Sequence, residues 1–249
     1  MLAGPMTAPE PPHPADASLE DRLDRISPLL QIESHRWDAD EWARSDQLLD
    51  QVEARVALAR GRLIYERFLR SGPGGSPARG ANGLPALPLF RRAAELFHRT
   101  GDAVREREAL FWVGTLEQTL NRNYAEAAVT LERAGELAKT AGDRLVLSGV
   151  ERHLGFLAFL EGVPVEARAH LEESVRLRRE IPFPAGVAMG LVALAELSLE
   201  QKDRDAAIRL LDEAAEVARA AGADGALAAI GEVRQRASGT KHAVPPSPE

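Results

Sequence analysis

The 249-residue chain contains no cysteine and few aromatic residues. The absence of cysteine excludes disulfide bonds, thiolate zinc sites, cysteine-ligated iron–sulfur clusters and a cysteine nucleophile. Aromatic residues make up 5% of the chain, whereas apolar residues as a whole make up 45%. A substantial core is therefore expected, and it must be built mainly from aliphatic side chains.

The chain also lacks an excess of positive charge and any long apolar run. The net charge is -7 and the pI is about 5.5, whereas a nucleic-acid-binding protein needs a basic face for phosphates. No window approaches the roughly 18 apolar residues of a membrane span, and residues 1–18 lack the basic flank and apolar run of a secretory signal. We therefore expect a cytoplasmic protein with no nucleic-acid partner and no membrane partner.

Sequence motifs for catalysis or metal binding are missing as well. None of the six histidines stands in an HExxH or other metal-binding spacing, and there is no GxxxxGK[ST] phosphate loop and no GxSxG motif. Paired carboxylates such as Glu172 and Glu173 point about 100° apart on a helix, which is typical of a charged surface. We predict no catalytic, cofactor or metal site and no enzyme activity. A helical pocket around Arg152 and His153 is the weaker alternative.

What the chain does have is a helical composition, in which Ala, Leu, Arg and Glu dominate, with regular breaks. Residues 1–17 and 239–249 are proline-rich arms without periodicity, for which we predict disorder. Residues 18–238 are predicted to form one helical domain, interrupted by a glycine- and proline-rich flexible loop at 71–85. Helices are expected at 38–70, 86–100, 103–120, 123–140, 144–161, 164–181, 185–201, 204–221 and 224–237.

The long helix at 38–70 carries one apolar stripe, whose members recur at spacings of seven, three and four residues. The favoured interpretation is that this stripe packs on the protein's own helices. The alternative is a coiled-coil-like seam between two copies, which would make the protein a homodimer through its long N-terminal helix. The stripe consists of Trp42, Leu49, Val52, Val56, Ala59 and Leu63.

The remaining helices repeat one pattern. Four alanines, Ala86, Ala127, Ala167 and Ala207, lie 41, 40 and 40 residues apart. Two antiparallel helices approach closely only where small residues meet, and a large apolar residue then fills the gap between neighbouring pairs. Four residues after each alanine stand Phe90, Leu131, Leu171 and Leu211, and seven residues after it stand Ala93, Ala134, Ser174 and Ala214. Small residues also precede the last three alanines at Gly114, Gly155 and Ala195, and the turn after Gly114 carries one extra residue.

This register resembles that of tetratricopeptide repeats, in the longer form of about 40 residues found in bacterial transcription activators and signalling proteins. The likeness rests on His153-Leu-Gly-Phe followed by Gly162, Ala167, Leu171 and Ser174, and on the equivalent residues of the neighbouring units. It implies an all-α fold: a right-handed α-solenoid of antiparallel helix pairs. A long N-terminal helix would precede the array, and a capping helix at 224–237 would end it.

In that family the first helix of each pair lines a concave groove that takes peptides or helices. Carried over by register, the groove residues are Phe111, Thr115, Gln118, Arg152, Phe156, Phe159, Met189, Val192, Glu196 and Leu199. The Lys and Asn residues with which some members hold a peptide's carboxyl terminus are absent here, so the apolar groove suits an apolar or amphipathic segment. The competing interpretation is that these residues are buried against neighbouring helices.

The sequence therefore predicts a non-enzymatic interaction module that binds a partner protein or peptide segment in its groove. The alternative is a regulatory or sensor domain that binds a small molecule and acts through another protein. The partner and the biological process are not readable from the residues.

Overall fold

A computed structural model describes residues 39–70 and 85–238, and these form helices joined by short turns. The predicted arms at 1–17 and 239–249, and all but the last residue of the predicted loop at 71–85, lie outside the described residues. The helices are α2 (Ala39–Arg70), α3 (Ala86–Arg99), α4 (Ala103–Leu116), the π-helix η1 (Glu117–Asn121), α5 (Tyr124–Thr140), α6 (Arg144–Leu160), α7 (Pro164–Arg179), α8 (Pro184–Glu200), α9 (Arg204–Ala220) and α10 (Asp224–Ala237).

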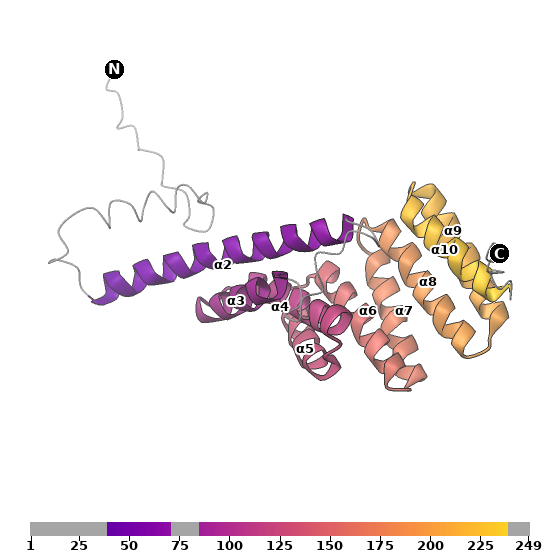
Figure 1. The fold of residues 1–249 in the computed structure, drawn as a ribbon, viewed down its shortest axis with the longest axis horizontal. Coiled ribbons are helices and arrows are strands. Elements are labelled where there is room, and N and C mark those ends of the chain that lie inside the picture. The colour runs from indigo at the N-terminus through magenta and orange to yellow at the C-terminus, as the bar shows by residue number, and fades with distance from the viewer. Residues whose placement is uncertain (1–38, 71–84, 239–249) are drawn as a thin grey trace, which may run out of the picture.

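The helices pack in chain order, as an α-solenoid does. The pairs are α2 with α3, α4 with α5, α6 with α7 and α8 with α9, and each pair stacks on the next. Figure 1 shows the array running from α3 to α10, with the long α2 lying along one edge. The last helix, α10, packs on both α9 and α8 and so covers the end of the array, as predicted. The predicted all-α solenoid architecture is confirmed.

The packing rule read from the repeat is also confirmed. The four reference alanines are fully buried, and the large apolar residues four positions later are buried. A Cβ atom added to Gly114 would lie 2.6 Å from Cγ of Leu131, and one added to Gly155 would lie 3.0 Å from Cγ of Leu171. A larger residue would therefore push the paired helices apart.

Three of the turns between helices share one scheme. Asp102, Asp143 and Asp203 each accept backbone N–H groups of the helix that follows, which caps its first turn. Asp224, in contrast, stands inside α10, and the capping position falls to Ala223. Gly142 and Gly162 have positive φ angles before the next helix begins, the conformation that glycine adopts most readily.

The extra residue after Gly114 appears as a change of helix type. The sequence predicts one α-helix over 103–120, but residues 117–121 form a π-helix that ends at Arg122 with φ 56°. A π-turn holds one more residue than an α-turn, so it absorbs the insertion without shifting the register of Ala127. It also turns Glu117 and Gln118 into the interior, where both are buried.

Helix α2 packs on α3, but not through its predicted stripe. Ala54, Ala57, Leu58 and Gly61 form the buried face, and a Cβ on Gly61 would lie 2.7 Å from the ring of Phe90. The favoured interpretation of the stripe is thus wrong for its large members, because Trp42, Leu49 and Leu63 are 48%, 43% and 52% exposed. Close packing of α2 on α3 requires small residues at the contact, so the large residues of the stripe lie on the other side of α2 and are exposed.

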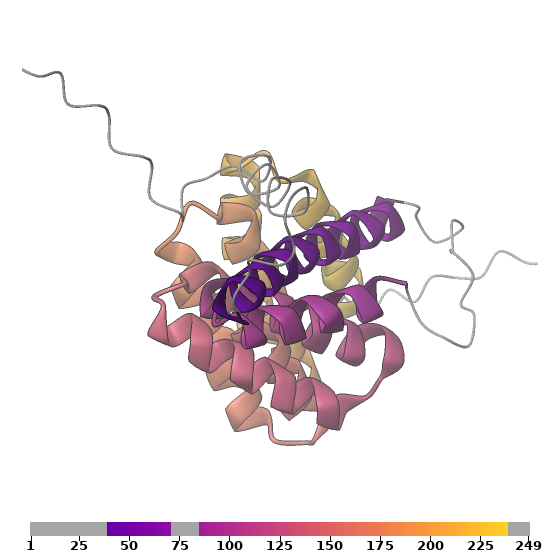
Figure 2. The ribbon, with the colours of Figure 1, turned by 90° about the vertical axis from the view of Figure 1, so that its left-hand side faces the viewer.

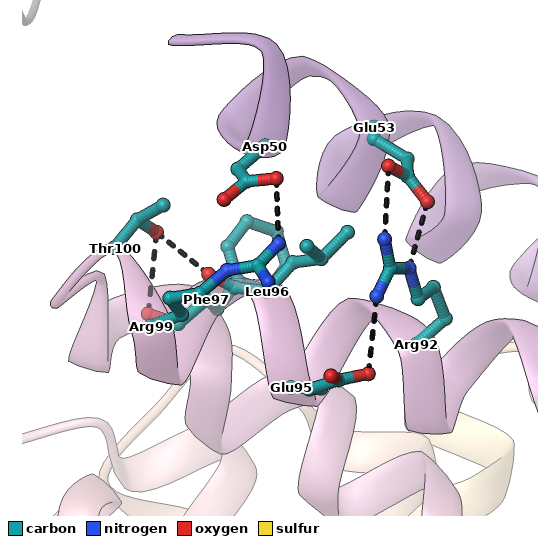
Figure 3. A network of polar contacts seen from close by, with 8 residues as sticks. All are labelled: Asp50, Glu53, Arg92, Glu95, Leu96, Phe97, Arg99 and Thr100. Carbon is teal, nitrogen blue, oxygen red and sulfur yellow. Dashed lines mark hydrogen bonds and ion pairs between the residues drawn. The ribbon is translucent and has the colours of Figure 1, made fainter. Parts of the chain in front are cut away.

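Ion pairs flank the contact between α2 and α3 (Figure 3). Arg92 donates two hydrogen bonds to the carboxylate of Glu53, at 2.7 and 3.2 Å, and a third to Glu95 at 3.2 Å. Arg99 donates to Asp50 at 2.6 Å. These groups are at least 39% exposed except for Asp50 at 22%, so they orient α2 on α3 rather than add much stability.

Apolar clusters run through the array. One lies where α2, α3 and α4 meet, a second between α5 and α6, and the largest spans α6 to α10. Viewed from the α2 end, the helix pairs stack behind one another (Figure 2). Within 39–70 and 85–238, no helix combines the length and hydropathy that a membrane span requires.

Candidate binding groove

Two adjoining hollows lie along the first helices of the pairs. The first, here called the arginine cavity, has a volume of about 650 Å³ and lies between α4 and α6. The second, the phenylalanine hollow, has a volume of about 370 Å³ and lies between α6 and α8. Arg152 lines both, so the two hollows meet at this residue.

The structure brings half of the ten predicted groove residues together in these hollows. Phe111 and Arg152 line the arginine cavity, and Phe156, Phe159 and Glu196 line the phenylalanine hollow together with Arg152. Leu199 lines a third, smaller hollow of about 250 Å³ beside Glu196. Met189 is exposed but lines none of these three.

Thr115, Gln118 and Val192 were predicted in the groove but are buried. Gln118 donates to the backbone carbonyl of His153 at 2.9 Å, and its side-chain oxygen lies next to Nδ1 of that histidine. Thr115 Oγ1 lies 3.3 Å from His153 Nε2. The π-helix thus aims Gln118 at α6, and for these three residues the competing interpretation of burial is the right one.

His153 is held neutral by its surroundings. Burial, followed by the charges of Arg152 and Arg178, lowers its pKa to about 3. Its hydrogen bonds fit a neutral ring with the proton on Nδ1 facing Gln118, which leaves Nε2 to accept from Arg152 at 3.1 Å. The ring is 4% exposed and serves to join α4 to α6.

Five arginines line the arginine cavity, and three of them have a carboxylate partner. Arg62 pairs with Glu108 at 3.1 Å, Arg105 with Asp102 at 2.6 Å and Arg107 with Asp143 at 2.8 Å. Glu108 and Asp143 are the acidic residues of the lining, and each already pairs with one of these arginines. The lining therefore contains no carboxylate that could pair with a further arginine.

The other two, Arg152 and Arg178, have no carboxylate of the described residues within ion-pair distance. Arg178 is 6% exposed, donates to the carbonyl of Gly186 at 2.9 Å and lies over the ring of Phe183. Burial, and then the nearby charge of Arg152, lowers the pKa of Arg178 to about 10. Partial loss of solvent also lowers the pKa of Arg152, although part of its side chain stays exposed.

Aromatic rings complete the wall. Phe111, Trp112 and Phe183 line the arginine cavity, and Trp112 also contacts the ring of Tyr65 on α2, with centroids 5.1 Å apart. The indole N–H of Trp112 and Nη1 of Arg107 are buried donors with no hydrogen-bond partner in the described part of the chain. The cavity is therefore rich in donors and poor in acceptors, a composition suited to a ligand with an anionic group and an apolar body.

Sequence reasoning missed Arg178, although the repeat register contains the signal. Arg178 stands eleven residues after Ala167, where the other units have Phe97, Ala138 and Ala218. Those three residues are fully buried. A charged residue at a core position of a repeat is a sign of special function, because burying a charge without a partner is costly. Arg107, Trp112 and Phe183 carry no comparable signal.

Among residues 39–70 and 85–238, no cluster of three or more potential ligand side chains could hold a metal ion.

Comparison with models of known protein families and with curated proteins gives no match. Among solved structures, the chain is similar to BtubC (BKLC) from P. vanneervenii, with 14% identity and a TM-score of 0.53, covering 92% of this chain and 76% of that one. A designed helical repeat protein, DHR64, and the DHF119 filament align at 24% identity over 88% of this chain. These alignments span 94% and 95% of the two structures' chains, but their TM-scores of 0.20 and 0.18 are too low to support a structural likeness. At 14% identity the likeness to BtubC concerns the fold alone.

Proposed function

We propose that this chain is a non-enzymatic interaction module of the tetratricopeptide type, which binds a segment of a partner protein along the groove formed by the two hollows. Helical repeat folds commonly present such extended concave surfaces. The proposal covers an apolar or amphipathic segment and leaves the identity of the partner open.

Two phenylalanines carry this proposal. Phe156 and Phe159 are 48% and 37% exposed, on one side of α6, and both line the phenylalanine hollow beside Leu171 and Leu197. Neighbouring exposed rings over a hollow form an apolar surface that a partner can cover. Burying two such rings supplies binding energy without any change in the fold.

The test is a double substitution, Phe156→Ala with Phe159→Ala, in the full chain. Both rings are exposed, so we expect the free energy of unfolding to change by no more than about 0.5 kcal/mol each. Short random peptides would be displayed and selected on immobilised protein, and affinities measured by fluorescence anisotropy. We expect the double variant to lose at least about tenfold in affinity, as removal of an interface hot spot does.

The matched control replaces two exposed valines outside the groove, Val129→Ala with Val165→Ala, which are 69% and 78% exposed. This control should bind the selected peptides as the unchanged protein does. Failure to select any peptide, or equal binding by both double variants, would count against the proposal.

A second candidate function is supported by the arginine cavity. A regulator that binds a small anionic molecule there, and acts through another protein, would use the same donors and rings. A thermal-shift screen with small carboxylates and phosphates checks this, and a set in which none raises the melting temperature would remove it.

A further inference from the structure

We infer that the arginine cavity receives an acidic side chain of the partner segment, while apolar residues next to it in sequence lie on Phe156 and Phe159. This inference rests on the function proposed above and adds the chemistry of the ligand.

The charge balance of the cavity is the first step. Arg152 and Arg178 lack a carboxylate partner, whereas the three other arginines of the lining have one. A buried cation without a counter-charge is destabilising, so packing alone gives no reason for Arg178 at this position. A carboxylate from a ligand would supply the missing charge, and guanidinium groups bind carboxylates with two parallel hydrogen bonds.

The shape of the groove is the second step. The arginine cavity has aromatic walls at Phe111, Trp112 and Phe183, which can cover the methylene groups of an acidic side chain. Arg152 lines both hollows, so a chain whose carboxylate reaches Arg152 has its neighbouring residues beside Phe156 and Phe159. The recognised feature is therefore an Asp or Glu adjacent to large apolar residues.

The experiment uses peptides selected from a random library on the full chain. We expect the selected sequences to be enriched in Asp or Glu next to an apolar residue. Replacing that residue by Asn or Gln should weaken binding by about 10- to 100-fold, because a hydrogen bond to a charged group is worth about 1.5–3 kcal/mol.

On the protein, Arg152→Gln and Arg178→Met should each abolish the preference for the acidic over the amide peptide. Circular dichroism checks that each variant stays folded. The matched control is Arg176→Gln, which removes the same charge from an exposed residue of α7 that already pairs with Glu173. This control should keep the preference.

Selection of purely apolar peptides would overturn the inference but leave the proposed function standing, whereas selection of none would overturn both. Acidic peptides that bind Arg152→Gln and Arg178→Met with undiminished preference would show that the carboxylate binds elsewhere. If benzoate bound as tightly as the peptides, the proposal that a partner segment occupies the cavity would be overturned, and a small ligand would be the occupant instead.

A second inference rests on α2 alone. We propose that the outward apolar face of α2 pairs two copies of the chain in an antiparallel coiled coil. The stripe fits a heptad pattern, with Leu49, Val56 and Leu63 at one core position and Val52 and Ala59 at the other. The residues that pack on α3, such as Ala54 and Leu58, fall on the opposite side of the helix. Within the described part of the chain, the large residues of the stripe therefore remain exposed.

The charges beside the seam select the orientation. The charged flanking residues of the first half of α2 are acidic and include Asp46, whereas those of the second half are arginines and include Arg60. Glu53 and Arg62 also lie on these flanks, but they already pair within the chain, with Arg92 and Glu108. A parallel pair would oppose acid to acid and base to base. An antiparallel pair opposes the acidic half of each helix to the basic half of the other, so only that orientation is favourable.

The oligomeric state of the full chain tests this by sedimentation over a range of concentrations. We expect a concentration-dependent dimer that Leu49→Glu with Leu63→Glu abolishes. Asp46→Lys alone and Arg60→Glu alone should each weaken dimerisation, while a mixture of these two variants should restore it. The matched control, Arg209→Glu on the exposed face of α9, should have no effect.

A monomer at every concentration would overturn this proposal. If, in that case, deletion of residues 1–38 produced the dimer, the chain's own N-terminal segment would be the occupant of the face instead. Dimers that the Leu49 and Leu63 substitutions leave intact would likewise place the interface elsewhere.

Discussion

At the scale of single residues, the groove owes its character to a few polar groups in a largely aliphatic molecule. Arg178 stands where the other units have an apolar core residue, and its guanidinium group contacts the carbonyl of Gly186, the hydroxyl of Ser148 and the ring of Phe183, but no carboxylate. His153 is equally buried, but it is neutral and has a full set of hydrogen bonds with Gln118 and Arg152. Side chains of similar burial therefore differ in role: His153 is neutral and joins two helices, whereas Arg178 carries a charge that no carboxylate of the described residues balances.

The neutrality of His153 predicts an acid-sensitive fold. Its pKa is about 3 in the folded chain against 6.5 for an unperturbed histidine. Between these values the unfolded chain binds a proton that the folded chain does not, so stability falls as the pH falls from about 6.5 towards 3. We expect this residue to contribute a slope of about 1.4 kcal/mol per pH unit in that window.

Urea unfolding of the unchanged chain and of His153→Gln, between pH 7 and about pH 4, would measure that slope. The variant should be less stable at pH 7, because its hydrogen bonds are disturbed, but should lose less stability on acidification. Parallel pH profiles would contradict the assignment of a buried neutral histidine.

At the scale of helices, one contact recurs: a small residue of the first helix faces a large apolar residue of the second. Gly61 faces Phe90, Gly114 faces Leu131 and Gly155 faces Leu171. The π-helix after Gly114 keeps this contact in register despite an inserted residue, and it also points Gln118 towards His153. The insertion therefore changes the interior without changing the array.

Gly114→Ala tests the contact. The added methyl would lie 2.6 Å from Leu131, and we expect a loss of about 1–3 kcal/mol in the free energy of unfolding from overpacking. Adding Leu131→Ala removes the clash, so the double variant should lose less than the sum of the two single changes. Chemical denaturation of the four proteins gives the coupling energy.

Gly231→Ala is the matched control, because nothing lies within 4 Å of an added Cβ at this helical position. It should stabilise α10 by about 0.5–1 kcal/mol through helix propensity. Equal effects of the two alanines would mean that close helix approach is not what requires Gly114.

At the scale of the whole molecule, contacts run mainly between neighbours in the array. The strongest exceptions are α10 with α8 and α4 with α6, each one step further along. Stability in such an array is a sum of local terms, so damage at one end should not spread far. The groove is built mainly on α4, α6 and α8, and α10 adds only Arg236 at the far side of the phenylalanine hollow.

Ile230→Ala tests this locality. Ile230 is buried where α10 covers the end of the array, so its truncation should cost about 2–4 kcal/mol. We expect faster hydrogen exchange in α9 and α10, with α3 to α5 unaffected, by mass spectrometry. Uniformly faster exchange along the chain would show that the array unfolds as one unit instead.

The sequence by itself determined the helices, their pairing and the residues at each close contact. The reason is that helical periodicity and the 40-residue register repeat the same packing requirement several times over. It also placed Phe111, Arg152, Phe156, Phe159 and Glu196 on one surface.

Only the tertiary structure decided which faces stay open. Thr115, Gln118 and Val192 share the register of the groove but are buried, because the π-turn and the neighbouring helices cover them. The stripe of α2 points away from α3, since small residues pack closer than large ones. The free charge of Arg178 depends on which carboxylates lie within reach in space, and no spacing along a single chain contains that information.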